Sequence, residues 1–141
     1  MYPDSKLSSR GLAQIIEQVC TACHNLGYTL GLNPAQWAAL RYFQHASTAQ
    51  KTVTGFANFQ GTTKGTASQT IAALVRKGYL ERVADTNDRR IHRVILTSEG
   101  EIMLTKDPLD ELADIINRLE EQERWALAVS LERVLRELKS V

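Results

Sequence analysis

Two cysteines and a histidine, Cys20, Cys23 and His24, are the side chains whose types and spacing best suit metal or redox chemistry. With the residues between them they form the pattern that attaches c-type haem, but haem of that type is attached outside the cytoplasm. The stretch from Met1 to Gln14 lacks the cationic and apolar blocks of an export signal. A closed zinc site needs four ligands, and only three lie together here. We therefore expect neither a metal nor a cofactor.

The same spacing also has a purely structural interpretation. Residues three and four positions apart share one face of a helix, where Cys20 and Cys23 would pack as small hydrophobic side chains. Binding of a single ion by Cys20, Cys23 and His24 also stays open. A cytoplasmic metal- or redox-sensing protein that uses these residues is therefore one alternative function.

The length and composition favour one compact domain. The chain has 141 residues, 43% of them hydrophobic, which can build one core but hardly two. Two cysteines rule out a disulfide-bonded scaffold. No run of about 18 apolar residues is present, so we expect no membrane span and a cytoplasmic location.

Charge is distributed unevenly along the chain, although the net charge is only +1. Residues 60–98 carry seven basic and three acidic side chains, a net of +4, whereas residues 99–141 carry a net of −5. A basic segment inside a nearly neutral protein suggests a surface that faces a polyanion. A histone-like basic tail and an acidic disordered tail are excluded.

Hydrophobic periodicity predicts five or six helices and one β-hairpin. The helices are expected over residues 7–26, 34–45, 53–59, 63–77 and 98–118 and from about 119 onward, and the strands over 80–83 and 91–96. Gly55 weakens the third helix by about 1 kcal/mol relative to alanine, and Gly61 suits the tight turn that follows it. Pro108 removes a backbone donor inside the fifth helix, which predicts a kink or a brief interruption there.

Capping residues predict where these helices begin. Asn33 followed by Pro34 combines an N-cap side chain with a residue whose missing N–H costs nothing in the first turn. Thr62 is the expected cap of the fourth helix. Ser98 with Glu101 fits a capping box at the start of the fifth.

A helix, a glycine turn, a second helix and a basic hairpin are the parts of a winged helix-turn-helix, whose second helix enters the major groove of DNA. At about 100° per residue, Ala67, Ile71 and Leu74 share one side of this second helix and are expected to pack inward. On the opposite side, Gln69 suits adenine and Arg76 suits guanine or a phosphate. The expected DNA contacts on and before this helix are Thr62, Thr63, Lys64, Thr66, Ser68, Gln69 and Arg76.

The hairpin and the residues after it, 85–100, read Asp-Thr-Asn-Asp-Arg-Arg-Ile-His-Arg-Val-Ile-Leu-Thr-Ser-Glu-Gly. This run resembles the wing signature of the multiple antibiotic resistance regulator (MarR) family. In that family an Asp and an Arg two positions later brace the hairpin, and a Leu-Thr pair with a nearby Gly leads into the dimerisation helix. The matching residues are Asp88, Arg90, Leu96, Thr97 and Gly100. Residues 74–82 and 32–37 resemble the end of the family's recognition helix and its second helix, so the resemblance covers nearly the whole chain.

The resemblance implies how the hairpin works. Asp88 and Arg90 would form a charge-assisted pair that sets the tip, leaving Arg89 or Arg93 to reach a minor groove or a phosphate. The expected DNA contacts of the hairpin are therefore Arg89, Arg90 and Arg93.

The resemblance also implies the organisation of the protein. We expect a mainly α-helical, winged helix-turn-helix protein with a small β-hairpin, formed as a single domain over residues 1–141. The DNA-binding lobe would be residues 33–97, and residues 7–26 and 98–139 would supply the dimerisation helices. Such a protein is a homodimeric transcription regulator without catalytic activity. It would bind double-stranded DNA at a pseudo-palindromic operator as a repressor released by a small ligand or an oxidant.

Members of the family often bind a small aromatic ligand between the dimerisation helices and the DNA-binding lobe. The residues expected nearest such a pocket are His24, Tyr28, Trp37 and Arg41. Some members sense oxidants through a cysteine near the N-terminal helix, which makes Cys20 and Cys23 redox candidates. A second alternative is a winged helix that binds a protein partner, and its binding would be insensitive to salt.

Overall fold

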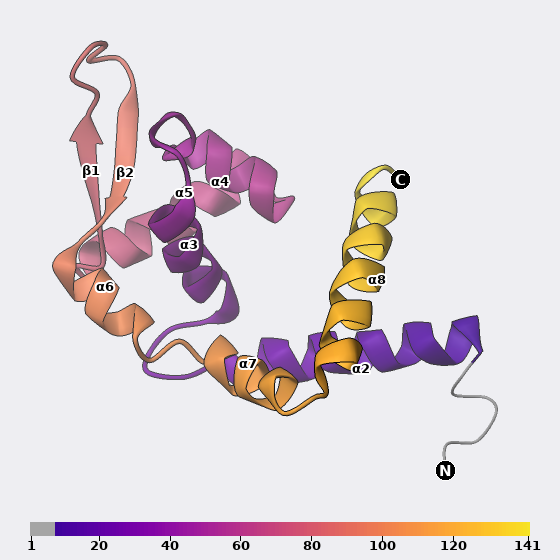
Figure 1. The fold of residues 1–141 in the computed structure, drawn as a ribbon. Helices are drawn as coiled ribbons and strands as arrows, with labels where there is room; N and C mark the ends of the chain where they lie inside the picture. Colours follow the sequence, from indigo (N-terminus) through magenta and orange to yellow (C-terminus); the bar gives the residue numbers. More distant parts are fainter. Residues whose placement is uncertain (1–7) are drawn as a thin grey trace. The chain divides into compact units, whose positions relative to one another are not determined.

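The structure, a computed structural model, describes residues 8–141 (Figure 1). Within these residues it has seven α-helices, one 3-10 helix and two strands. They are α2 (Ser9–Leu26), α3 (Pro34–His45), η1 (Thr48–Gln50), α4 (Val53–Gln60), α5 (Lys64–Arg76), β1 (Leu80–Ala84), β2 (His92–Leu96), α6 (Ser98–Leu104), α7 (Leu109–Asn117) and α8 (Glu121–Lys139). The strands form one antiparallel pair. The expected mainly α-helical fold with a small hairpin is confirmed.

The chain divides into two compact units, one ending at Asp107 and the other running from Pro108 to Val141. The first unit includes α2 to α6 and the hairpin, and the second includes α7 and α8. The division falls at the expected interruption, because α6 ends at Leu104 and α7 begins at Leu109. The single helix expected over 98–118 is therefore two helices, which raises the number of α-helices above the expected five or six.

The caps of α2 and α3 explain where these helices begin. The Asn33 side chain accepts a hydrogen bond from the Gln36 N–H at 2.9 Å, and the Gln36 side chain accepts one from the Asn33 N–H at 3.0 Å. This reciprocal capping box fixes the start of α3 at the predicted N-cap, Asn33, although the part played by Gln36 was not predicted. The Ser8 hydroxyl caps α2 by accepting from the Gly11 N–H at 3.0 Å. Leu7, the expected start of that helix, lies outside the described residues.

Two other caps differ by one residue from the expectation. Thr63, not Thr62, caps α5, because its hydroxyl accepts from the backbone N–H three residues later at 3.1 Å. Thr97, not Ser98, caps α6 by the same bond at 3.0 Å. At both places two adjacent hydroxyl residues satisfy the sequence pattern, and the extended backbone at Thr63 and Thr97 selects the one that caps.

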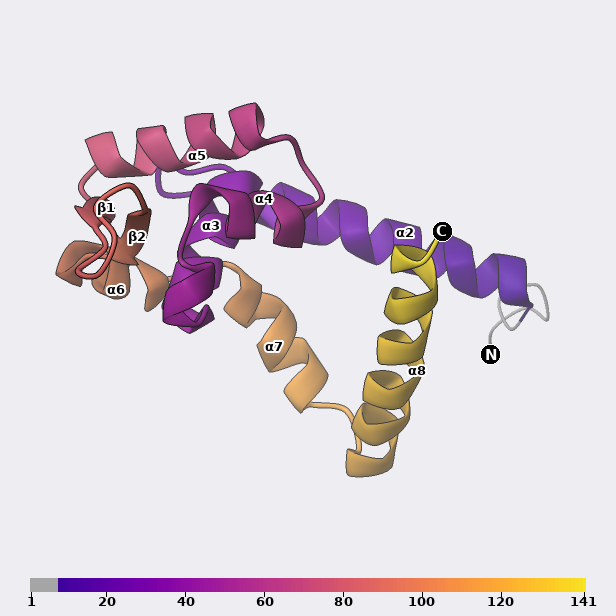
Figure 2. The ribbon, with the colours of Figure 1, turned by 90° about the horizontal axis from the view of Figure 1, so that it is seen from above.

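α3, α4 and α5 pack with the base of the hairpin around one core, and α5 lies across α3 and α4 (Figure 2). The largest fully buried side chains are Trp37, Phe43, Phe56, Leu40, Ile71, Leu74, Leu80 and Val94. The register of the hairpin pairs Leu80 with Leu96, so Leu80 and Val94 reach this core from neighbouring strands. The core therefore positions α5 and the hairpin relative to each other.

Three helices carry apolar side chains that the chain itself does not bury. Within α2, α7 and α8 no residue is buried. The exposed large apolar residues are Leu12, Ile15, Ile16, Val19 and Leu26 on α2, Leu109 and Ile115 on α7, and Trp125, Val129, Leu131, Val134, Leu135 and Leu138 on α8. None of the helices in the described part of the chain is long and apolar enough to cross a membrane.

Candidate nucleic-acid interface

α5 has one buried and one exposed side. Ala67, Ile71 and Leu74 have no exposed surface, which confirms the predicted inward side. The exposed residues on the other side are Thr66, Gln69 and Arg76. Gly61 ends α4 with a φ of 68°, in the left-handed region that favours glycine, and so makes the tight turn between α4 and α5. The helix-turn-helix therefore presents a polar side of α5 to the outside.

The start of α5 is suited to an anion. Its first turn carries the exposed Lys64 and no acidic residue. The Thr63 hydroxyl caps the helix and donates to the Thr66 hydroxyl at 3.0 Å, while Thr62 and Ser68 are half-buried. Because no carboxylate of the helix offsets the positive end of its dipole, this end can interact with a negative group from outside.

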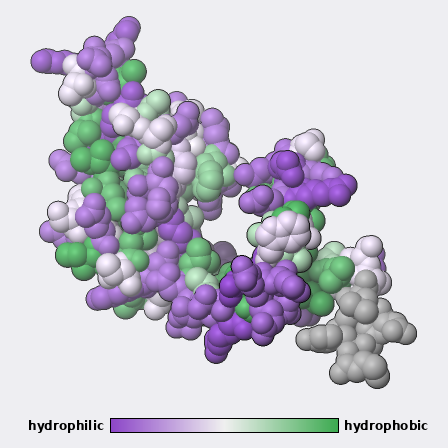
Figure 3. Space-filling model, in the orientation of Figure 1, coloured by the Kyte–Doolittle hydropathy of each residue, from purple (hydrophilic) through white to green (hydrophobic). Residues whose placement is uncertain are grey.

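The whole hairpin, residues 80–96, is called the wing below. Its tip holds the predicted ion pair. Arg90 donates from Nε and Nη2 to the two carboxylate oxygens of Asp88, each at 3.0 Å. These bonds hold the pKa of Asp88 below its usual range. Arg89 and Arg90 are exposed, and hydrophilic side chains gather at the tip (Figure 3). The pair itself is confirmed, whereas its bracing of a DNA contact stays a prediction.

Arg93 lies away from the exposed tip and is held from within the protein. Its Nε donates to Asp85 Oδ1 at 3.2 Å, and its Nη1 donates to the carbonyl of Ala49 at 3.1 Å. The side chains of Arg93 and Asp85 are only 17% and 16% exposed. The guanidinium of Arg93 is thus engaged by two groups of the same chain, and its expected contact with DNA stays a prediction.

Asp85 organises the turn of the wing and is not among the expected site residues. Its carboxylate accepts from the backbone N–H groups of Asn87 and Asp88 at 3.1 and 3.0 Å, and it pairs with Arg93. Aspartate at the first position of a turn commonly makes such bonds, and this was the available signal in the sequence. The Asp88 and Asn87 N–H groups, followed by Arg93, hold the pKa of Asp85 below its ordinary value.

Acid is expected to loosen this turn. Because folding lowers the pKa of Asp85, its contribution to stability is complete above the ordinary value of 3.8 and is lost as the pH falls through the lower folded pKa. In an NMR titration, the Asn87 and Asp88 amide signals should report this step below pH 3.8. Asp85→Asn should abolish it, and Asp88→Asn controls for the neighbouring carboxylate. A midpoint for Asp85 at or above its ordinary value would contradict the assignment.

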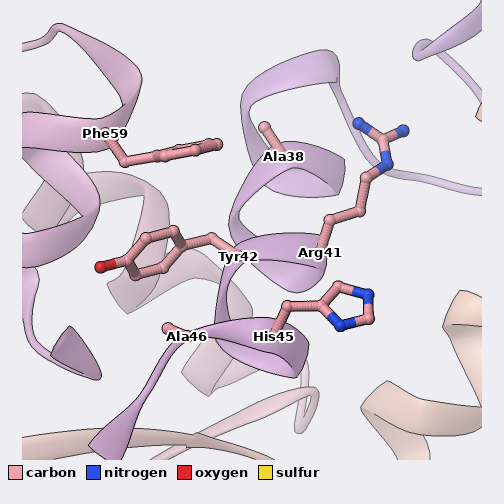
Figure 4. Close-up of a pocket in the computed structure, with 6 residues that line it drawn as sticks. All are labelled: Ala38, Arg41, Tyr42, His45, Ala46 and Phe59. Atoms are coloured by element: carbon pink, nitrogen blue, oxygen red, sulfur yellow. The ribbon is translucent and has the colours of Figure 1, made fainter. Parts of the chain in front are cut away.

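A cavity of about 420 Å³ lies beside α3. It is lined by Ala38, Arg41, Tyr42, His45, Ala46 and Phe59 (Figure 4). Of the four expected pocket residues, Arg41 lines this cavity. Arg41 also donates from Nε and Nη2 to the two carboxylate oxygens of Asp107, both at 2.7 Å. The cavity therefore combines aromatic and alanine walls with two side chains that can carry positive charge, Arg41 and His45.

The other three expected pocket residues lie elsewhere. Trp37 is fully buried, and its Nε1 has no hydrogen-bond partner within the part of the chain that the structure describes. It is thus a core residue, because the inward side of α3 carries it together with Leu40 and Phe43. Tyr28 and His24 contact each other at the end of α2, with Tyr28 Oη 3.3 Å from His24 Nε2, and neither lines the cavity.

The cysteines of α2 are free thiols. Cys20 is exposed and Cys23 is half-buried. In residues 8–141, no three or more His, Cys, Asp or Glu side chains gather so that they could hold a metal ion. The placement of Cys20 is compatible with a reactive thiol, and its redox role stays a prediction.

The arrangement of α4, α5 and the wing defines a winged helix-turn-helix protein. Residues 30–91 match the model of the MarR family. This match covers α3, α4, α5, β1 and the tip of the wing, and it confirms the resemblance to the MarR family seen in the sequence. A comparison with curated proteins finds no match.

Solved structures share this fold over nearly the whole chain. The S. aureus MepR–DNA complex has a TM-score of 0.72 at 20% identity and covers 94% of this chain and 98% of that one. Streptococcus pneumoniae FabT in complex with DNA has a TM-score of 0.67 at 21% identity, over 92% and 93% of the two chains. A probable transcriptional regulator from Pseudomonas aeruginosa has a TM-score of 0.69 at 24% identity, over 86% and 95%. At these identities the likeness concerns the fold.

Proposed function

We propose that the protein is a sequence-specific, DNA-binding transcriptional regulator that acts as a homodimer on a pseudo-palindromic operator. The observation that carries this proposal is the polar side of α5, a helix whose first turn has no acidic residue. The same compact unit also contains the wing, whose tip carries Arg89 and Arg90. Thr66, Gln69 and Arg76 would meet base edges in the major groove. MepR and FabT, which share the fold, have been solved with DNA.

The first turn of α5 and the tip of the wing would supply the contacts to phosphates. Lys64 and the hydroxyls of Thr62, Thr63 and Ser68 lie at or near the first turn, where they suit phosphate oxygens. Arg89 and Arg90 extend from the wing and suit a phosphate or the minor groove. The chemistry of all these groups is that of binding, so we propose a cytoplasmic regulator rather than an enzyme.

The homodimer follows from the apolar surfaces of α2 and α8. Each helix exposes a row of large apolar side chains that its own compact unit leaves uncovered. A second copy of the chain would bury such surfaces. One recognition helix also contacts too few base pairs to single out a site in a genome, and a dimer doubles the number.

Selection of bound fragments from random DNA by the purified protein tests this function directly. A common two-fold motif whose binding weakens steeply with salt supports it. Recovery of random fragments without a motif would contradict sequence-specific binding. Binding of a protein partner, insensitive to salt, would instead favour the winged-helix interaction module.

Gln69→Ala is expected to relax the base preference at one position in each half-site, because a bidentate amide contact with adenine discriminates by about 1–3 kcal/mol. Competition binding against operators altered one base pair at a time measures the effect. Gln44→Ala, on the exposed surface of α3, is the matched control and should leave the preference unchanged. A uniform loss of affinity for every sequence would assign Gln69 a positioning role instead.

A small aromatic ligand is the effector that the cavity beside α3 favours. Its walls include the rings of Tyr42 and Phe59, while the side chains of Arg41, which is paired with Asp107, and His45 carry nitrogen atoms that can hydrogen-bond an acidic group (Figure 4). Titration of benzoate-type acids into the protein–DNA complex should release the DNA, and Arg41→Gln should weaken this response. Oxidation at Cys20 and Cys23 is the other proposed trigger, and Cys20→Ser tests it separately.

A further inference from the structure

Three consecutive carbonyls before α4 are held by groups from other elements. The carbonyl of Ala49 accepts from Arg93 Nη1 at 3.1 Å, that of Gln50 from Tyr42 Oη at 2.7 Å, and that of Lys51 from the Val94 N–H at 2.8 Å. Residues 49–51 therefore form a strap, fastened on one side to α3 and on the other to β2 of the wing. Because α4 begins two residues later at Val53, the strap joins the wing to the helix-turn-helix.

Arg93 is the side chain that ties the wing to this strap. Its Nε bonds the Asp85 carboxylate, beyond the end of β1, and its Nη1 bonds the strap at Ala49. One planar guanidinium thus connects the turn of the wing, β2 and the strap. Since both charged side chains are mostly removed from solvent, this pair is screened less by salt than a pair at the tip.

Arg89 provides the contrast four residues earlier. Its side chain is exposed, and no hydrogen bond or ion pair to another described residue holds it. Arg89 is thus available to a phosphate, whereas the Nε and Nη1 groups of Arg93 already bond groups of the protein. Two arginines of one wing therefore have different physical roles.

We propose that Arg93 is a positioning residue, which fixes the wing against the helix-turn-helix through Asp85 and the Ala49 carbonyl without touching DNA. This inference rests on the proposed DNA-binding function. A wing already held in its bound orientation loses little conformational freedom on binding, so the loss of this tie lowers the affinity for DNA. The loss of this tie does not change the number of DNA phosphates that the protein neutralises.

The salt dependence of DNA binding separates positioning from contact. Each phosphate contact adds about one unit to the slope of log affinity against log salt concentration. Arg93→Ala is expected to weaken binding roughly tenfold at every salt concentration, with the slope unchanged, as for a loss of about 1.4 kcal/mol. Arg89→Ala is the matched control and should lower the slope by about one unit. A similar fall in slope for Arg93→Ala would overturn the proposal.

Arg93→Lys sharpens the comparison, because lysine keeps the charge but lacks the planar fork that reaches two acceptors. If Arg93 positions the wing, the lysine variant should bind DNA nearly as weakly as the alanine variant. If Arg93 contacted a phosphate, lysine would restore most of the affinity. Restoration by lysine would therefore reject the positioning role.

Hydrogen exchange in the absence of DNA tests the tie independently of the proposed function. The Val94 N–H bonds the Lys51 carbonyl, so loosening of the strap should speed its exchange. Arg93→Ala and Asp85→Asn should both do so while the Ile71 amide, in the core of α5, stays protected. Unchanged exchange at Val94 overturns the tie even if affinity falls. Failure of the wild type to bind DNA rejects the proposed function but leaves this measurement decisive for the tie.

Discussion

Replacing Leu135 with glutamate is expected to convert the protein from a dimer to a monomer or an aggregate at micromolar concentration, with loss of specific DNA binding. Leu135 is 52% exposed in the single chain and lies in the apolar row of α8 with Leu131, Val134 and Leu138. In a two-fold dimer the substitution would bury an unpaired carboxylate twice, at a cost of several kcal/mol. Analytical ultracentrifugation of the two proteins measures the change.

Ala126→Glu is the matched control for this experiment. Ala126 is exposed and lies on the side of α8 opposite Leu135. A glutamate at this position adds the same charge to the same helix but lies outside the apolar row. It should leave the protein a dimer. A wild type that sediments as a monomer and still binds a palindrome tightly would reject the assembly.

Gly55→Ala is expected to destabilise the first unit by about 1–3 kcal/mol, although alanine favours helices over glycine by about 1 kcal/mol. A Cβ atom at this buried position would collide with the Gln50 carbonyl and lie 2.6 Å from Tyr42 Oη. These two atoms form one of the hydrogen bonds of the strap, so the substitution must displace the strap or α4. Urea denaturation monitored by circular dichroism measures the loss.

Gly65→Ala is the corresponding control for Gly55→Ala. Gly65 also lies within a helix, but nothing stands within 4 Å of the place where its Cβ would be. Its replacement should leave stability unchanged or raise it by up to about 1 kcal/mol. Equal stability of the two variants would show that the close approach at Gly55 does not constrain the fold.

Patterns that depend on one helix alone proved the most predictable. The inward side of α5 follows from the helical period, and Ala67, Ile71 and Leu74 are buried as that period requires. The N-cap of α3 at Asn33 and the interruption at Pro108 are also local, since each follows from the donors and acceptors of a few adjacent residues.

Features that depend on distant contacts could not be predicted in this way. Nothing in the sequence near Arg93 indicates that Ala49 lies beside it, and without that contact Arg93 resembles any other basic residue of a wing. The sequence likewise marks Gly55 only as a residue that lowers the stability of a short helix. It does not show that the Gln50 carbonyl lies close to the Gly55 backbone. Trp37 was expected near a ligand pocket, but the core encloses it fully. The sequence alone does not show how completely a tryptophan is buried.

The way the wing is fastened determines which part of it can change length. At its base the Thr97 hydroxyl donates to the Gly78 carbonyl at 2.6 Å, and at its far end the Asp85 N–H donates to the Ile91 carbonyl at 2.9 Å. Residues 86–90 lie beyond both fastenings. Since the entropy of closing a loop grows slowly with its length, an insertion there costs little beyond the bonds that Asn87 and Asp88 make to the Asp85 carboxylate. The span of DNA that the wing reaches is therefore open to adjustment, in evolution or by design, independently of the core.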